Sequence, residues 1–245
     1  MKILILCRSK SGRISPYIKE QVDSIMTFGI NVEYLLIRGK SPFSYLSSYP
    51  LLLKKVKDYN PDIIHAHYGL CGLLASIQRK IPVVITFHGS DINNSVVRKI
   101  SKIAATLSKA NIYVSSKLAQ VSSNRAGVII PCGVNFDQFR PIENSEARKM
   151  LHFEQNIKYI LFSSSFRHKV KNYSLAKEAV TKTQGYKIEL IELKGFDRDQ
   201  VAHLLNAADL ALMTSYSEGS PQFIKEALAC NCPIISTNVG DVQEL

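Results

Sequence analysis

Two glutamates, Glu218 and Glu226, with seven residues between them, are the side chains of this chain best placed to do chemistry. An apolar run at 210–214 indicates a strand that leads into the first of them. Ser220 followed by Pro221 is typical of a helix N-cap and first helical residue, so Glu218 is predicted in a loop and Glu226 inside the helix. The start of that helix favours an anionic ligand, because unpaired backbone N–H groups and the positive end of the dipole converge there.

The loop and the helix start suit different groups of one ligand. A carboxylate repels a phosphate, so Glu218 is better suited to neutral hydroxyl groups, whereas the helix start suits the phosphate. Phosphate and hydroxyl groups together indicate a sugar nucleotide. The acid–base carboxylate pair of a glycoside hydrolase fits poorly, because both glutamates belong to one loop–helix element and need not flank a scissile bond.

A second segment that could meet a phosphate is polar and then basic, at residues 163–172, directly after another predicted strand. It carries four cationic or potentially cationic side chains, namely Arg167, His168, Lys169 and Lys171. Cations and helix-end amides can stabilise the charge on a departing diphosphate without a metal ion. The alternative is a basic loop that is simply solvated.

Histidines follow two neighbouring predicted strands of the first half. His65 and His67 lie two apart and should face the same side, where we expect them to line a cleft rather than bind a metal ion, because a third ligand is missing nearby. His88 ends the next strand, and open α/β sheets bind ligands at the carboxyl ends of their strands.

The turn after the first strand contains Gly12, which either lets the backbone approach a ligand closely or is a simple loop glycine. A dinucleotide fold would need three spaced glycines in this turn, so a nicotinamide enzyme is disfavoured.

Short apolar runs alternate with amphipathic stretches around these residues, as in the βαβ units of a parallel sheet. The first half has six predicted strands, near residues 2–7, 31–37, 62–66, 82–87, 111–115 and 127–130. The second half has four, near residues 157–162, 187–193, 210–214 and 233–236. Helices are predicted at 15–28, 96–108 and 146–153, and another is capped by Asp197.

A segment rich in turn-forming residues, 131–141, indicates a connector anchored by Phe136 and Phe139. We therefore predict an α/β protein of two Rossmann-like domains, at 1–142 and 143–245. Because such a half typically has about six strands, the four strands reached by Leu245 predict an incomplete second domain.

The composition bounds the function class. With 46% hydrophobic and 21% charged residues, the chain has the balance of a globular protein, and no apolar run is long enough to span a bilayer. Five scattered cysteines and a start too short for a signal peptide favour the cytoplasm. The net charge of +11 favours anionic partners, although dispersed basic residues speak against nucleic acid. Residues 50–57 mix apolar and basic side chains and could contact the inner face of a membrane, unless that helix only packs on the sheet.

Together these segments resemble the family 4 glycosyltransferases, which have the GT-B fold. The resemblance runs along the whole chain: residues 218–230 with Pro233 match the two-glutamate motif, 131–141 the connector, and 65–67 and 87–91 the first-domain motifs. It implies two Rossmann-like halves facing across a cleft. It also implies retaining sugar transfer from a nucleotide-diphosphate sugar to a glycan or lipid-linked acceptor, without a metal or separate cofactor, in cell-surface polysaccharide or glycan assembly.

The resemblance further implies roles for single residues at the donor's sugar and ribose. Glu226 resembles the residue that binds the ribose, and Glu218 the one that contacts the sugar hydroxyls, with Gly219 and Ser220 beside it. His88 resembles the histidine near the reacting carbon.

Other residues resemble the family's diphosphate site. Lys171 matches the lysine that neutralises the diphosphate, and Gly12 lies where the first-domain loop approaches it. The family usually places an arginine five residues before this lysine, but that position is Phe166 here. Arg167, one step later, is the expected substitute.

Two other readings stay open. The missing strands and the missing closing helix of the family suggest a non-catalytic nucleotide-sugar-binding fragment. A phosphorylase of similar fold would use inorganic phosphate and would be active without any nucleotide.

Overall fold

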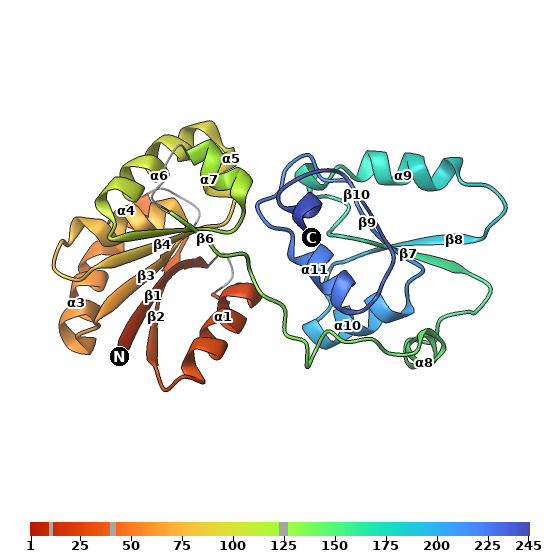
Figure 1. Cartoon of the computed structure of the whole chain (residues 1–245), viewed down its shortest axis with the longest axis horizontal. Coiled ribbons are helices and arrows are strands. Elements are labelled where there is room, and N and C mark those ends of the chain that lie inside the picture. Colours follow the sequence, from red (N-terminus) through yellow and green to blue (C-terminus); the bar gives the residue numbers. More distant parts are fainter. Residues whose placement is uncertain (10–11, 40–42, 123–126) are drawn as a thin grey trace. The chain divides into compact units, whose positions relative to one another are not determined.

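Alternating apolar runs and amphipathic stretches fold into two units, Met1–Cys132 and Gly133–Leu245, each built on its own parallel sheet (Figure 1). The computed structural model describes residues 1–9, 12–39, 43–122 and 127–245. The predicted boundary at 142/143 falls inside the second unit, because the connector residue Phe139 is fully buried in the second core, against side chains such as Leu205.

The first sheet has the strand order β2-β1-β3-β4-β5-β6, and its neighbouring strands are parallel. The strands are β1 (Lys2–Ser9), β2 (Asn31–Arg38), β3 (Ile63–His67), β4 (Val83–Phe87), β5 (Ala110–Tyr113) and β6 (Val128–Ile129). All six predicted strands of this half are confirmed.

Helices cover this sheet on both faces. They are α1 (Pro16–Met26), α2 (Phe43–Ser47), α3 (Tyr49–Tyr59), α4 (Gly69–Ile77), α5 (Ser90–Asn93), α6 (Ser95–Leu107) and α7 (Ser116–Ser122). Alternate residues of β1 serve the two faces: Ile5 packs with Val22 of α1, whereas Leu4 packs with Leu52 of α3 and Leu74 of α4.

The helix predicted at 96–108 forms α6, but two of its large apolar side chains do not face the core. Gly69 of α4 lies so close to α6 that an added Cβ would come within 2.0 Å of the Ser101 hydroxyl oxygen. Helix α6 therefore buries its small residues, including Ser101 and Ala104, against α4. Ile103 and Leu107 are left exposed on the outer side of the helix. Close packing of small residues, rather than the apolar stripe, orients this helix.

The second sheet has the order β10-β9-β7-β8, again with parallel neighbours. Its strands are β7 (Lys158–Phe162), β8 (Ile188–Glu192), β9 (Leu210–Met213) and β10 (Ile234–Ser236), as predicted. The helices are α8 (Asn144–Met150), α9 (Tyr173–Lys182), α10 (Arg198–Ala207) and α11 (Gln222–Ala229), with 3-10 turns η1 (Lys169–Lys171) and η2 (Val242–Glu244). Asp197 caps α10 as predicted, because it exchanges two hydrogen bonds with Gln200.

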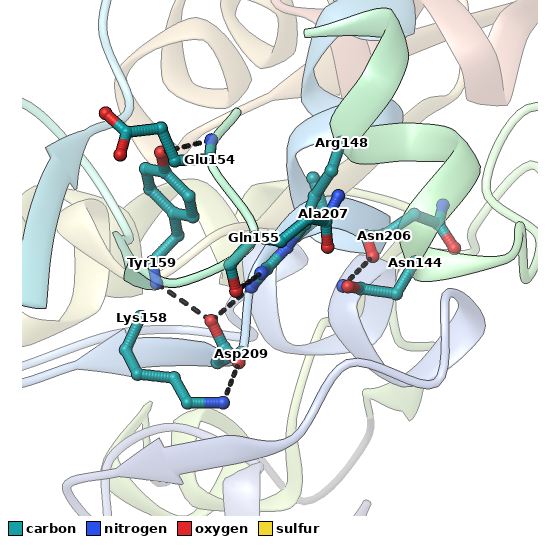
Figure 2. A network of polar contacts seen from close by, with 9 residues as sticks. All are labelled: Asn144, Arg148, Glu154, Gln155, Lys158, Tyr159, Asn206, Ala207 and Asp209. Atoms are coloured by element: carbon teal, nitrogen blue, oxygen red, sulfur yellow. Dashed lines mark hydrogen bonds and ion pairs between the residues drawn. The ribbon is translucent and has the colours of Figure 1, made fainter. Parts of the chain in front are cut away.

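A buried ion pair ties α8 to the sheet of the second unit (Figure 2). The guanidinium of Arg148 lies 2.5 Å from Asp209, which also accepts hydrogen bonds from Lys158 Nζ at 2.9 Å and from Tyr159 N at 2.8 Å. Burial alone would raise the pKa of Asp209, but these donors and the charge of Arg148 hold it below its ordinary value. The segment that follows the connector is thereby fixed to β7.

Within the described ranges, no helix combines the length and the apolar character needed to cross a membrane. All five cysteines lie in those ranges and are free thiols.

Candidate functional site

Lys171 and Glu218 are brought together at the carboxyl ends of β7 and β9, which are neighbours in the second sheet. Lys171 lies in the turn η1 after β7, and Glu218 lies in the loop between β9 and α11, as predicted. Lys171 Nζ is 2.6 Å from Glu218 Oε1, and the two side chains are 17% and 16% exposed. A cation and a carboxylate therefore stand side by side where open α/β sheets bind ligands.

The two loops are tied to each other by hydrogen bonds. The Thr214 hydroxyl donates to the carbonyl oxygens of Lys171 and Asn172, at 3.0 and 2.9 Å. The backbone N–H of Tyr216 donates to the Val170 carbonyl oxygen at 2.9 Å. The lysine and the glutamate are consequently held by the backbone of both loops and not by their ion pair alone.

The helix that carries Glu226 begins one residue later than predicted. Pro221, not Ser220, is the N-cap, and α11 starts at Gln222. The Ser220 hydroxyl does not cap the helix, because it donates to Asp241 Oδ2 at 2.7 Å. Lys225 Nζ donates to the same hydroxyl and lies 3.3 Å from Asp241. Buried Lys225 and Asp241 thus hold the loop in place through the Ser220 hydroxyl.

The loop backbone after Glu218 holds two N–H donors, those of buried Gly219 and half-buried Ser220. Among the described residues, no group accepts a hydrogen bond from either N–H. The loop is packed tightly on Gly240, where an added Cβ would lie 2.9 Å from the Gly219 carbonyl oxygen. Rigid backbone donors beside Lys171 are suited to a phosphate group.

Glu226 has a different cation from Glu218. Its carboxylate is 2% exposed, and Oε1 lies 2.7 Å from NH1 of Arg198 at the start of α10. The Arg198 guanidinium also lies 4.5 Å from the ring centroid of Phe139. Arg198 was not predicted as a site residue, because its contact with Glu226 joins two helices and depends on how those helices pack. The predicted ribose contact of Glu226 stays a prediction.

Arg167 is exposed, whereas the preceding Phe166 stacks on Tyr173 with ring centroids 4.1 Å apart. The Phe166 N–H donates to Glu192 at 2.7 Å and lowers the pKa of that carboxyl, and the charge of Arg167 acts in the same direction. The position where the family has an arginine is therefore an aromatic packing position in this chain. The diphosphate role of Arg167 stays a prediction.

In the first unit, three histidines from β3 and the end of β4 stack in a row. The ring centroids are 4.6 Å apart for His65 and His67 and 5.2 Å apart for His67 and His88. His65 and His67 do face the same side, but the prediction that they line a cleft is wrong. They are only 6% and 0% exposed.

Burial controls the charge of all three rings. It lowers the pKa of His65 to about 4 and that of His88 to about 3. Burial and the two neighbouring histidines hold the pKa of His67 well below its usual range. The half-buried His88 ring is flanked by Tyr17 and Tyr68, each with its ring centroid 5.0 Å away, and the two phenol groups hydrogen-bond to each other.

Asp91 fixes the turn that carries His88. Its buried carboxylate accepts hydrogen bonds from the backbone N–H groups of Gly69, His88 and Gly89, at 3.2, 3.1 and 2.9 Å. Gly89 has a φ of 118°, which only glycine adopts readily. Burial raises the pKa of Asp91 to about 6, although the three N–H donors act to lower it.

Gly12 lies in an exposed turn with a φ of 81°, and an added Cβ would meet no atom within 4 Å. Its neighbours at 10–11 lie outside the described residues, so its approach to a ligand stays a prediction. Across the described ranges, no cluster of three histidine, cysteine or acidic side chains could hold a metal ion. A hollow of about 380 Å³ beside α3 is lined by none of the predicted site residues.

The comparisons with known proteins agree for both units. Residues 5–138 match the profile of Glycosyltransferase Family 4, and residues 171–245 match that of Glycosyl transferases group 1. The chain is 28% identical over 238 residues to the putative teichuronic acid biosynthesis glycosyltransferase TuaC of Bacillus subtilis. The alignment covers 85% of this chain and 61% of TuaC. It is 26% identical over 230 residues to N-acetyl-alpha-D-glucosaminyl L-malate synthase of Bacillus anthracis, covering 76% and 59% of the two chains. The chain thus spans about three fifths of these relatives.

Solved structures show the same fold. Sucrose-phosphate synthase from Thermosynechococcus elongatus superposes with a TM-score of 0.82 at 15% identity, over 98% of this chain and 82% of that one. Anabaena HepE, in complex with UDP and glucose, gives 0.76 at 15% identity, over 100% and 82%. The fold is GT-B, with two Rossmann-like domains of which the second is small. With one profile matching more than half of its length, this chain belongs to Glycosyltransferase Family 4.

Proposed function

We propose that this chain carries the donor and acceptor sites of a retaining glycosyltransferase, which moves a sugar from a nucleotide-diphosphate sugar to an acceptor hydroxyl. One observation carries the proposal: Lys171 and Glu218 lie 2.6 Å apart beside the N–H groups of Gly219 and Ser220. The cation and the N–H groups suit the phosphates, and the carboxylate suits the sugar hydroxyls. The names of TuaC and of the malate synthase support an acceptor from glycan or small-molecule glycoside biosynthesis.

The chemistry needs charge stabilisation at the leaving group. The bond between the anomeric carbon and the phosphate oxygen breaks, and a bond from that carbon to the acceptor oxygen forms on the same face. The acceptor's proton passes to the departing diphosphate. Lys171 and the Gly219 and Ser220 N–H groups stabilise the growing negative charge, with exposed Arg167 as a further cation. We propose that these groups replace a metal ion, so turnover in EDTA is expected.

Glu218 would change partners when the donor binds. Without a ligand, its carboxylate offsets the charge of Lys171 across their short contact. A diphosphate gives Lys171 a more highly charged partner and leaves Glu218 to accept hydrogen bonds from sugar hydroxyls. We propose the ribose as the partner of Glu226, through the carboxylate that Arg198 already orients.

The α2–α3 surface, defined by exposed Phe43, Leu46, Leu51 and Leu53 with Lys54 beside them, supports the predicted membrane contact. Leu52 is fully buried, so α3 packs on the sheet and still exposes apolar side chains. We propose that this surface meets the anionic inner face of a membrane, with the protein in the cytoplasm.

A second candidate is nucleotide-sugar binding without transfer. Both candidates predict binding of the donor, and only the first predicts a product.

Thermal-shift measurements on the full chain with a panel of nucleotide-diphosphate sugars test donor binding, which both candidate functions predict. A ligand that binds only the folded protein raises Tm, by an amount that grows with its concentration. We expect at least one nucleotide sugar to raise Tm more than its free nucleotide does. A panel in which only inorganic phosphate stabilises the chain would contradict the proposal in favour of a phosphorylase.

A further inference from the structure

His67 lies in the middle of the histidine row and touches His88 by a hydrogen bond as well as by its ring face. Nδ1 of His67 is 2.9 Å from Nε2 of His88. The other nitrogen of His67, Nε2, is buried and has no hydrogen-bond partner among the described residues. For His88 the free position is Nδ1, which takes no hydrogen bond within the same part of the chain.

One proton occupies the hydrogen bond between the two rings. Both rings are neutral at neutral pH, because burial and the neighbouring rings hold the pKa of each below its usual range. The groups that face them are the His65 ring, on the far side of His67, and the phenols Tyr17 and Tyr68 beside His88. Asp91 is turned to backbone N–H groups. Since a neutral imidazole carries a single N–H, the proton's position fixes both tautomers.

Two arrangements satisfy this bond. In the first, His67 donates from Nδ1, its Nε2 is a bare lone pair, and His88 carries its own proton on Nδ1. In the second, His88 donates from Nε2, and His67 must then bury an Nε2–H that no acceptor meets. A donor buried without an acceptor loses the hydrogen bond that it had in water, and unbonded buried donors are rarer than underused acceptors. The first arrangement is therefore favoured.

We propose that His67 is a positioning residue that locks His88 as a hydrogen-bond donor, with the Nδ1–H of His88 offered to a ligand oxygen. The identity of that oxygen, a sugar hydroxyl or a phosphate oxygen of the donor, rests on the proposed function. The tautomer does not.

The consequence for the reaction is specific. A ring whose open nitrogen already carries a proton can donate a hydrogen bond, but it cannot accept the acceptor's proton. His88 is thereby a polarising group and not a general base. This agrees with a transfer in which the departing diphosphate itself takes up the proton. His65 differs from His67 in this respect, because its Nε2 bonds to the Thr86 hydroxyl at 2.8 Å and it does not hydrogen-bond to His88.

The direct test is the nitrogen NMR spectrum of the full chain labelled with ¹⁵N-histidine, recorded at pH 7 without any ligand. Protonated and bare ring nitrogens have well separated shifts, and the His88 signals are those that vanish in His88→Asn. The expected result is a single tautomer of His88 with the proton on Nδ1. Protonation on Nε2, or an even mixture of both forms, would overturn the proposal.

Matched variants test the role of His67. His67→Phe keeps a ring and removes the N–H that donates to His88, so His88 should become a mixture of tautomers. The affinity for the nucleotide sugar should fall about tenfold, an ordinary loss for one hydrogen bond. His65→Phe likewise keeps a ring but removes no hydrogen bond to His88, so it should leave the His88 spectrum unchanged. His67→Asn, whose amide can donate from nearly the same place, should restore the Nδ1 proton. Equal effects of His67→Phe and His65→Phe on that spectrum would show a merely structural role.

The two hypotheses fail separately. If no nucleotide sugar binds, the proposed function fails while the ligand-free spectrum still decides the tautomer. If donors bind and His88 carries its proton on Nε2, the function stands and the inference fails.

Discussion

Glu218 and Glu226 are eight positions apart in the sequence and pair with different cations in the structure. Glu218 meets Lys171 in a half-open loop, whereas Glu226 is almost sealed against Arg198. The Glu226 side chain is 3% exposed and the Glu218 side chain 16%, so loss of its cation should be felt more at Glu226, where water can screen the charge less. Ser220 and Pro221 predicted the loop and the helix, but a contact between residues far apart in the chain leaves no trace in the local sequence.

Replacement of Glu226 tests whether this glutamate binds the ribose or only anchors Arg198. We expect Glu226→Ala to weaken nucleotide binding by about 1–3 kcal/mol, the cost of one charge-assisted hydrogen bond. Calorimetry of nucleotide binding measures the change, with Arg198→Met as the control that breaks the same ion pair from its other side. Equal affinities in the wild type and Glu226→Ala would rule out the ribose contact.

Replacement of Glu218 distinguishes binding of the diphosphate from binding of the sugar. Glu218→Gln removes the charge that offsets Lys171, so bare pyrophosphate should bind about threefold to tenfold more tightly, as expected for a partly exposed ion pair. The same variant should bind the nucleotide sugar less tightly than the wild type, because a neutral amide accepts weaker hydrogen bonds from hydroxyls. Competition binding measures both. A drop in pyrophosphate affinity would contradict the proposed division of roles.

At the scale of elements, the histidine row shows what the alternation of a strand can and cannot reveal. The alternation placed His65 and His67 on one face of β3, and the structure confirms this. It could not reveal that both rings are buried, because burial depends on which parts of the chain pack against that face. The same limit explains α6, whose apolar stripe is outside because Gly69 and Ser101 bring α4 and α6 together. Strands, by contrast, were predictable, since apolar runs are a local signal.

The buried histidines predict that acid destabilises the first unit. Burial lowers the pKa of His65 to about 4 and that of His88 to about 3, and it holds the pKa of His67 well below its usual range, so below about pH 6.5 the unfolded chain binds more protons than the folded one. The free energy of unfolding must then decrease as the pH is lowered. Asp91, whose pKa is raised to about 6, acts in the opposite direction over part of this range.

The net loss between pH 6.5 and pH 5 should be about 3–4 kcal/mol, from the three histidines less the share of Asp91. Urea unfolding followed by circular dichroism measures it, and His67→Phe should make the pH dependence shallower. A urea midpoint that stays constant or rises on acidification would contradict the assignment of neutral, buried rings.

At the scale of the whole molecule, the sequence predicted two α/β units, and the structure divides the chain after Cys132. The connector was recognised by its turn-forming residues. It belongs to the second unit because Phe139 packs in the core of that unit. That packing is a long-range contact, and no local pattern reports it. The expectation that the chain is truncated stays a prediction.

The net charge of +11 and the exposed α2–α3 surface together predict binding to anionic vesicles. Binding should weaken as salt is raised, and the double variant Leu46→Ser and Leu53→Ser should weaken it at constant charge. Co-sedimentation with vesicles that contain or lack phosphatidylglycerol measures this. Equal binding to both kinds of vesicle would contradict the role of the anionic lipid, and binding to neither would contradict the membrane contact.

Lys171 is the residue proposed to stabilise the charge on a departing diphosphate. The most direct measurement is the release of nucleoside diphosphate from a nucleotide sugar that binds the full chain, in EDTA, with wild type, Lys171→Ala and Lys169→Ala compared. The account predicts release by the wild type, a fall of at least about tenfold in kcat for Lys171→Ala with a smaller change in donor affinity, and little change for the exposed neighbour Lys169. Equal kcat in the wild type and Lys171→Ala, or release that stops when EDTA is added, would contradict it.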